Sequence, residues 1–290
     1  MGNIVVFGAS GQLGQCFKNI AETQQIPDIY FPPESEANIL DNAAIAGVFA
    51  QYKPTFCINC AAYTAVDKAE DDIELATKIN VIGVENLGRY CKENRTVLIH
   101  ISTDFVFEGD KSTPRKETDI AEPISVYGKT KLDGEKAVES ILEEYYIMRT
   151  GWLYSEFANN FVKTMLKLGS ERDVLKIIAD QTGTPTYAFD LAQCILDIIR
   201  SNKNAFGTYH YSNEGIASWY DFTKAIFELS GTATKVLPIR TDEYPTKATR
   251  PAYSVLDKSK VKNTFQIEIP YWRESLKVCL NKLKTINNIH

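Results

Sequence analysis

N-I-V-V-F-G-A-S-G-Q-L-G (Asn3–Gly14) is the stretch that decides the fold of this chain. Asn3–Phe7 is short, apolar and rich in β-branched residues, which favours a buried strand. Gly8, Gly11 and Gly14 follow, and a helical pattern then continues to about Thr23. Gly8 permits a sharp turn, Gly11 lets a pyrophosphate approach the backbone, and Gly14 lets the helix pack on the sheet. The stretch therefore predicts dinucleotide binding at the start of the first helix.

The rest of the first 150 residues alternates between strand and helix patterns. Strands are expected at 28–31, 55–61, 97–102 and 145–149, and helices at 43–52, 71–94 (two stretches) and 125–144. This alternation predicts an α/β fold with a doubly wound parallel (Rossmann) sheet. We assign residues 1–150 to a dinucleotide-binding domain. Residues 151–290 form a smaller, mainly substrate-binding region that partly returns to the sheet.

Composition excludes several classes of function. The 290 residues are 44% apolar and 24% charged, and the net charge of −5 gives no basic face for nucleic acid. No apolar run approaches the roughly 20 residues that cross a bilayer. The chain runs directly into its first strand without a cationic leader, so we expect no membrane partner and a cytoplasmic protein.

Two clusters suggest a metal site but have simpler interpretations. Cys57 and Cys60 form a C-x-x-C pair, yet they lie in an apolar run that predicts a buried strand, so we read them as core residues. The acidic residues at 67–74 occupy the start of a helix, where they favour the helix dipole and solvent. His100 is interpreted as a strand residue, and no metal site is predicted.

Tyr127 and Lys131 are four residues apart on the predicted helix 125–144, so they share one face. A nearby ammonium favours the phenolate and lowers a tyrosine pKa. Such a pair suits reduction of a carbonyl, in which a nicotinamide gives hydride to carbon and the phenol gives a proton to oxygen. Thr103 lies at the carboxyl end of the predicted strand 97–102 and can direct a hydroxyl at the same oxygen, because ligands gather at the carboxyl ends of parallel strands.

The same spacing occurs a second time, at Tyr220 and Lys224. No strand end with a hydroxyl precedes that pair at a similar distance. It also follows Trp219 in a predicted amphipathic helix. We therefore interpret Tyr220 and Lys224 as structural.

Ten motifs, in order along nearly the whole chain, resemble the dTDP-4-dehydrorhamnose reductase family of extended short-chain dehydrogenases. They are GASGQLG (8–14), NCAAYTAVDKAE (59–70), ISTDFVFEG (101–109), YGKTKLDGEKA (127–137), RTGWLY (149–154), NNFVKTML (159–166), DQTGTPT (180–186), GTYHYSNEG (207–215), SWYDF (218–222) and RPAYSVLD (250–257). The resemblance implies reduction of the 4-keto group of dTDP-4-dehydro-L-rhamnose by NADPH or NADH.

The resemblance also implies roles for particular residues. Tyr127 would be the proton donor, Lys131 its tuner and Thr103 its hydroxyl partner, while Asp104 would adjust the electrostatics beside the sugar and Trp152 would lie against the sugar ring. The implied cofactor contacts are Gly11, Gln12 and Leu13 at the pyrophosphate, Asn38 and Ile39 at the adenine, and Ala62, Tyr63 and Thr64 at the middle of the cofactor. Phe105, Gly151 and Asn38 depart from the residues usual in the family.

Several points stay open at this stage. Trp152 could equally be a core aromatic, and Arg250 could hold a substrate phosphate or form a surface ion pair. Tyr30-Phe31-Pro32-Pro33 replaces the acidic residue that usually marks NAD preference, so the choice between NADPH and NADH is open. The oligomeric state is also open, with a homodimer as one alternative. A related epimerase or dehydratase and a non-catalytic regulatory subunit are the rival functions.

Overall fold

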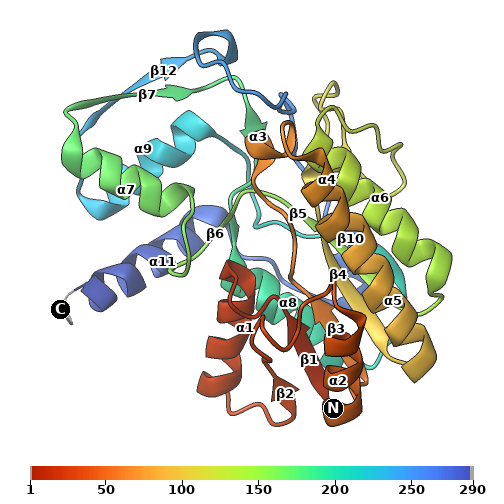
Figure 1. The fold of residues 1–290 in the computed structure, drawn as a ribbon. Helices are drawn as coiled ribbons and strands as arrows, with labels where there is room; N and C mark the ends of the chain where they lie inside the picture. The colour runs from red at the N-terminus through yellow and green to blue at the C-terminus, as the bar shows by residue number, and fades with distance from the viewer. Residues whose placement is uncertain (1, 288–290) are drawn as a thin grey trace.

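The computed structural model describes residues 2–287 and is built around a six-stranded parallel sheet (Figure 1). The strand order is β2-β1-β3-β4-β5-β10. The strands are β1 (Ile4–Phe7), β2 (Ile29–Tyr30), β3 (Phe56–Asn59), β4 (Val97–Thr103), β5 (Tyr145–Thr150) and β10 (Gly207–His210). The order reverses between β1 and β3, where a doubly wound sheet opens a crevice at the carboxyl ends of its strands. The predicted fold class is confirmed.

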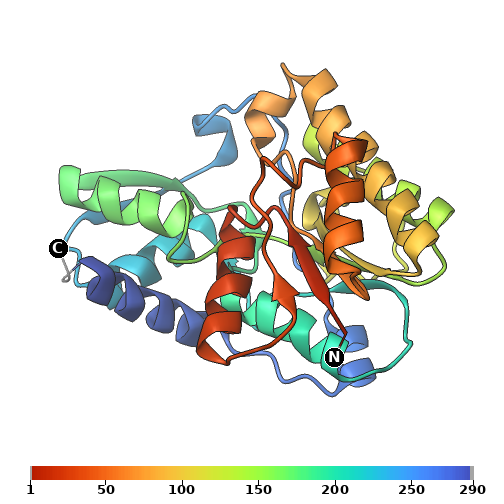
Figure 2. The same ribbon diagram turned by 60° about the horizontal axis from the view of Figure 1, so that its bottom comes forward.

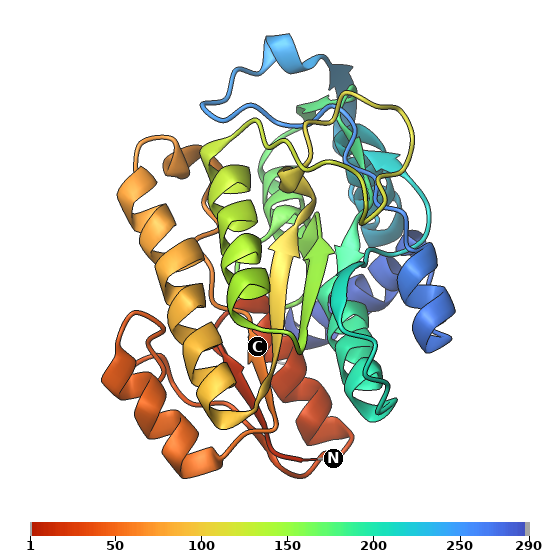
Figure 3. The same ribbon diagram turned by 90° about the vertical axis from the view of Figure 1, so that its right-hand side faces the viewer.

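Helices cover both faces of the sheet (Figures 2 and 3). One face packs against α1 (Gln12–Thr23) and α8 (Ala188–Arg200), and the other against α2 (Asn42–Tyr52), α5 (Gly83–Asn94) and α6 (Val126–Ile141). Strand β1 shows why its sequence is apolar throughout. Ile4 and Val6 join the first core, and Val5 and Phe7 join the second, because successive side chains point to opposite faces.

The glycine turn between β1 and α1 is tightly packed. Gly8 has φ +73°, and a Cβ there would lie 2.5 Å from the backbone nitrogen of Ala61. A Cβ at Gly14 would lie 2.5 Å from the carbonyl oxygen of Gly8. Both positions therefore exclude any side chain, the first through conformation and contact and the second through contact alone.

The segment between β3 and β4 differs in detail from the two helical stretches expected at 71–94. A short α3 (Val66–Ala69) is followed by α4 (Ile73–Thr77), a π-helical turn (Lys78–Ile82) and α5 without a break. The π-helical turn places Asn80 inside the protein, where its side-chain oxygen accepts a hydrogen bond from the Tyr63 backbone nitrogen at 2.9 Å. Isolated π-helical turns of this kind are frequent near functional sites.

Most of the chain after residue 150 forms a second region beside the carboxyl edge of the sheet (Figure 1). It contains three two-stranded pairs, β6–β9, β8–β11 and β7–β12. Its elements are β6 (Leu153–Tyr154), α7 (Phe161–Glu171), β7 (Val174–Ile178), β8 (Thr182–Gly183), β9 (Thr186–Tyr187), β11 (Ala217–Ser218), α9 (Trp219–Ser230), β12 (Lys235–Ile239) and α11 (Trp272–Asn287). From this half of the sequence, β10 pairs with β5, α10 (Ser259–Phe265) packs on β10, and α8 covers the sheet. Within residues 2–287, no helix is both long and apolar enough to cross a membrane.

Candidate active site

The N-terminus of α6 fixes the position of Tyr127. Ser125 caps this helix by accepting a hydrogen bond from the Gly128 backbone nitrogen at 3.1 Å, and the Glu70 carboxylate accepts one from Val126 at 2.9 Å. The Tyr127 ring meets Phe105 edge to face, with 5.6 Å between the ring centroids. These contacts hold the phenol at the carboxyl end of β4.

Thr103 and Asp104 lie where β4 ends and a 3₁₀ turn (Asp104–Val106) begins. The Thr103 hydroxyl accepts a hydrogen bond from Phe105 at 3.2 Å and donates one to Asp104 Oδ1 at 3.1 Å. Gly151, just after β5, leaves space for this carboxylate, because a Cβ there would lie 2.5 Å from Asp104 Oδ2. Burial raises the pKa of Asp104 to about 6, against opposing hydrogen bonds from Ser254 and Thr103.

The phenol of Tyr127 is strongly protonated in this environment. Burial raises its pKa to about 12; the Thr103 hydroxyl opposes the rise and the Asp104 carboxylate adds to it. The helix spacing predicts that Lys131 lowers this pKa, and that prediction is wrong for this arrangement, because burial is the largest effect and Lys131 is not among the groups that shift the pKa. A phenol with this pKa keeps its proton at neutral pH and gives it up only to a stronger base, such as a developing alkoxide.

Lys131 is 2% exposed and lies one turn further along α6. Its ammonium donates to the Ile101 carbonyl at 2.7 Å and lies 3.4 Å from His100 Nε2. Burial lowers the pKa of Lys131 to about 8, whereas Glu135 and Cys60 act to raise it. The lysine can therefore exchange a proton near neutral pH.

Behind Lys131 lies a buried ion pair that sequence reasoning missed. Arg149 of β5 contacts both oxygens of Glu135, with the shortest distance 2.6 Å from Nη2 to Oε2. Ser102 Oγ also donates to this carboxylate. The one available sequence signal was spacing, since Glu135 lies four residues after Lys131 on the same helix face. This network fixes α6 against β4 and β5.

The predicted pyrophosphate-binding residues lie together at the start of α1. Gly11 caps this helix without a side-chain hydrogen bond, so its first backbone N–H groups can bind an anion. Leu13 is buried in the core. The Gln12 side chain donates to the Leu153 carbonyl at 3.2 Å and accepts from Asn160 at 2.9 Å, which ties the turn to the second region.

The other predicted cofactor residues lie on loops that follow β2 and β3. Ala62 is half-buried, Tyr63 is buried and Thr64 is exposed, and Asn80 holds this loop through both polar backbone atoms of Tyr63. Asn38 is exposed and its side chain accepts a hydrogen bond from Leu40 at 2.9 Å. Ile39 is 4% exposed, which leaves its side chain to the core.

Trp152 has an unusual backbone conformation and a stacked ring. Its φ of +51° is left-handed, a conformation that costs a non-glycine residue on the order of 1–2 kcal/mol. The indole lies parallel to that of Trp219, with 3.4 Å between the ring centroids and 3° between the planes. Such outliers concentrate at functional sites, where surrounding structure enforces them.

Arg250 forms an ion pair with Asp67 of α3. Its two terminal nitrogens contact the two carboxylate oxygens at 3.1 and 2.6 Å, and this arginine is the main cause that lowers the pKa of Asp67. Lys247 pairs with Asp71 beside it. The acidic start of this segment thus binds a loop of the second region, and residues 2–287 contain no group of three side chains arranged to hold a metal ion.

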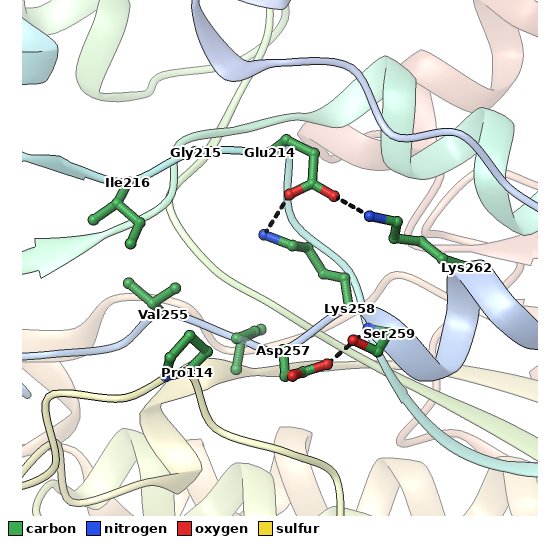
Figure 4. A pocket seen from close by; sticks show the side chains of 10 residues that line it. Pro114, Glu214, Gly215, Ile216, Val255, Asp257, Lys258, Ser259 and Lys262 are labelled. Carbon is green, nitrogen blue, oxygen red and sulfur yellow. Dashed lines mark hydrogen bonds and ion pairs between the residues drawn. The ribbon is translucent and has the colours of Figure 1, made fainter.

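A pocket of about 310 Å³ opens away from these residues (Figure 4). Its charged side chains neutralise one another, because Glu214 contacts Lys258 at 3.4 Å and Lys262 at 2.8 Å. None of the predicted site residues lines it. The pocket therefore offers no unpaired cation for a phosphate.

Together, a glycine turn at a helix N-terminus and a tyrosine, lysine and threonine at the end of β4 define an oxidoreductase of the short-chain dehydrogenase type. The RmlD substrate binding domain family matches residues 2–285. The dTDP-4-dehydrorhamnose reductase of Aggregatibacter actinomycetemcomitans is 39% identical, over 96% of this chain and 98% of the relative. The chain belongs to the RmlD family.

Solved structures agree with this assignment. A dTDP-4-dehydrorhamnose reductase from Clostridium acetobutylicum is 41% identical with a TM-score of 0.92, covering 97% of this chain and 99% of that one. The enzyme from Bacillus anthracis, solved in complex with NADP, is 37% identical with a TM-score of 0.93, covering 97% and 100%. The predicted family and enzyme class are confirmed.

Proposed function

We propose that this protein reduces the 4-keto group of dTDP-4-dehydro-L-rhamnose to give dTDP-L-rhamnose, with NADPH or NADH as the reductant. The observation that carries the proposal is the protonated Tyr127 phenol beside Thr103 and Asp104 at the carboxyl end of β4. The relatives named above support the substrate, and the NADP complex of the Bacillus anthracis enzyme supports the cofactor.

The residues of the glycine turn and of the loop after β2 fit a dinucleotide. The N-terminus of α1, where no side chain occupies the first backbone N–H groups, suits a pyrophosphate, with Gly8, Gly11, Gln12, Leu13 and Gly14 around it. Asn38 and Ile39 would meet the adenine, through the backbone in the case of Ile39. When bound, a reduced nicotinamide supplies a hydride to the carbonyl carbon of the sugar.

The protein supplies the proton. Tyr127 Oη gives its proton to the developing alkoxide at O4, so the keto group gains one hydride and one proton and becomes a hydroxyl. Thr103 would donate a hydrogen bond to the same oxygen. Lys131, with its pKa lowered to about 8, can return a proton to Tyr127 and hold the ribose of the cofactor.

The substrate contacts extend into the second region. Trp152 would lie against the sugar ring, with its strained backbone and Trp219 stack holding the indole. Arg250 would serve a substrate phosphate only by changing its contact with Asp67, since both ends of its guanidinium are engaged there. Among the predicted substrate residues, Arg250 therefore has the weakest structural support.

The residues of the site argue against two rival functions, a dehydratase and a non-catalytic subunit. A dehydratase requires an acid/base next to the Thr-Asp pair, and Phe105 occupies that position with its ring against Tyr127. A non-catalytic subunit has no chemical need for Thr103, Tyr127 and Lys131 together.

The decisive assay follows oxidation of NADPH and NADH with the dehydrorhamnose nucleotide generated in place by the upstream enzymes. We expect oxidation with at least one cofactor and a rhamnose nucleotide as product. No oxidation with either cofactor would reject the proposal, and turnover with tightly held NAD and no added reductant would favour an epimerase.

The cytoplasm remains the expected compartment, and a homodimer remains one alternative for the assembly.

A further inference from the structure

A histidine that the reaction above does not use lies in contact with Lys131. His100 of β4 is fully buried, and its neighbour across the sheet is Asn59 of β3. Asn59 Nδ2 lies 3.2 Å from His100 Nδ1, and His100 Nε2 lies 3.4 Å from Lys131 Nζ. The three side chains form one line of polar contacts through the interior of the sheet.

The orientation of the Asn59 amide is determined by the backbone. Asn59 Oδ1 accepts a hydrogen bond from the Ala61 nitrogen at 3.0 Å. A flipped amide would turn its NH₂ group toward that N–H, and two donors would face each other. Asn59 Nδ2 therefore points at the imidazole and must donate to His100 Nδ1.

The protonation of the ring follows from this contact. Burial and the charge of Lys131 hold the pKa of His100 well below its usual range, so the ring is neutral and carries one proton. Because Nδ1 accepts from Asn59, that proton must reside on Nε2. The Nε2–H group then faces Lys131 Nζ, where it repels an ammonium and can donate to a neutral amine.

We propose that Asn59 and His100 are positioning residues for Lys131, holding an imidazole N–H against its Nζ so that the neutral amine becomes accessible at the active site. The other groups that face this nitrogen are Glu135 on α6 and Cys60 after β3, both of which favour the ammonium, and the Ile101 carbonyl, which accepts from it. His100 is the neighbour whose contact opposes them. The inference rests on the proposed function only for the role of Lys131.

The tautomer can be measured in the protein without cofactor or substrate. ¹⁵N NMR of histidine-labelled protein distinguishes protonated from unprotonated ring nitrogens, and the signals missing from His100→Gln identify those of His100. We expect a proton on Nε2 and none on Nδ1 at pH 7. A proton on Nδ1, or on both nitrogens, would overturn the proposal.

The effect on Lys131 can be tested by reversing the direction of the hydrogen bond between Asn59 and His100. Asn59→Asp replaces the donor by an acceptor, which should move the imidazole proton to Nδ1 and turn Nε2 into an acceptor for the ammonium. NMR of ¹³C-labelled lysine, assigned with Lys131→Met, should then show the Lys131 midpoint rising by about one pH unit or more.

The same substitution in a protein without His100 separates the effect of the tautomer from that of the added charge. In the double variant Asn59→Asp/His100→Met, the new carboxylate acts on Lys131 only through space. Adding Asn59→Asp to His100→Met should therefore raise the Lys131 midpoint less than half as much as adding it to the wild type. Equal shifts of the Lys131 midpoint in the wild type and in His100→Met would show that the effect of residue 59 does not pass through His100.

If Asn59→Asp does not fold, His100→Gln replaces it, because a Gln carboxamide can place oxygen toward Asn59 and nitrogen toward Lys131. We expect its Lys131 midpoint to stay near that of the wild type, and a shift as large as in His100→Met would overturn the proposal. Failure of the dehydrorhamnose assay would leave all these outcomes unaffected.

Discussion

The chain contains the same local design twice, in α6 and in α9. Each helix is capped by a serine, Ser125 or Ser218, and each carries a tyrosine two residues after the cap. A lysine follows each tyrosine by four positions, giving Tyr127 with Lys131 and Tyr220 with Lys224. The two N-termini differ at their third residue, where Asp221 completes a capping box with Ser218 and Gly128 has no side chain to do so.

The surroundings of the two lysines differ. Lys131 is buried against His100 and the Ile101 carbonyl, whereas Lys224 is exposed; both tyrosines are half-buried. The residue before Tyr220 is Trp219, which stacks on Trp152. Helix spacing therefore sets only which side chains share a face, and the end of a neighbouring strand decides whether that face has chemistry.

The largest difference between the copies should appear in turnover. Tyr127→Phe removes the proposed proton donor and should lower kcat by about 100-fold or more. Tyr220→Phe is the matched control and should stay close to wild type. Steady-state NADPH oxidation measures both, and comparable losses in the two variants would contradict the distinction.

The next largest difference should lie between the two lysines, in how their substitution changes the affinity for the cofactor. Lys131→Met should weaken NADPH binding by roughly 10- to 100-fold, the usual cost of a lost charged hydrogen bond. Lys224→Met should leave it unchanged. Fluorescence titration of each variant with NADPH gives the dissociation constants, and an unaltered value for Lys131→Met would exclude a contact with the cofactor.

Stability against pH tests the same lysine. The pKa of Lys131 is about 8 in the folded protein and 10.5 for an ordinary lysine, so the unfolded chain binds more protons between these limits. The free energy of unfolding contributed by this group therefore rises with pH from about 8 toward 10.5. Urea unfolding across this window should show the slope in wild type and in Lys224→Met, and its persistence in Lys131→Met would refute the assignment.

Asp104, beside Thr103, gives a further test of the site at α6. Its pKa is raised from 3.8 to about 6, so the folded state holds this proton more tightly, and stability is lost as pH rises through that interval. Asp104→Asn should therefore stabilise the protein at pH 7 by about 1–3 kcal/mol while lowering turnover. Denaturant unfolding at pH 4 and pH 7 checks this, because the gain should be small at pH 4.

The smallest effect concerns the two serine caps. Ser125→Ala and Ser218→Ala should each cost about 1 kcal/mol of stability, since each removes one N-cap hydrogen bond, and Ser218→Ala also removes the hydrogen bond from its hydroxyl to Asp221. Only Ser125→Ala should also lower kcat, because Tyr127 lies in the first turn that Ser125 fixes. Equal turnover in both variants, measured well below their melting temperatures, would mean that the cap does not position the phenol.

Local patterns were enough to predict much of the fold. Apolar runs and the glycine turn identified β1 to β5, and the rule that ligands gather at strand ends placed Thr103 beside Tyr127. Strand β10 could not be identified, because Gly207–His210 is short and half polar. Side-chain partners were also beyond prediction where distant segments meet, as in Arg250 with Asp67 or Trp152 with Trp219.

The pairing of β10 with β5 has a consequence for how the chain can be divided. A fragment ending at residue 150 would leave the backbone groups of β5 unpaired on one side, and Tyr146 and Met148 would lose the cover of α8. Exposed strand edges of this kind recruit other chains. Residues 1–150 are therefore unsuited to use as an autonomous module, and during synthesis the six-stranded sheet can be completed only after residue 210 has left the ribosome.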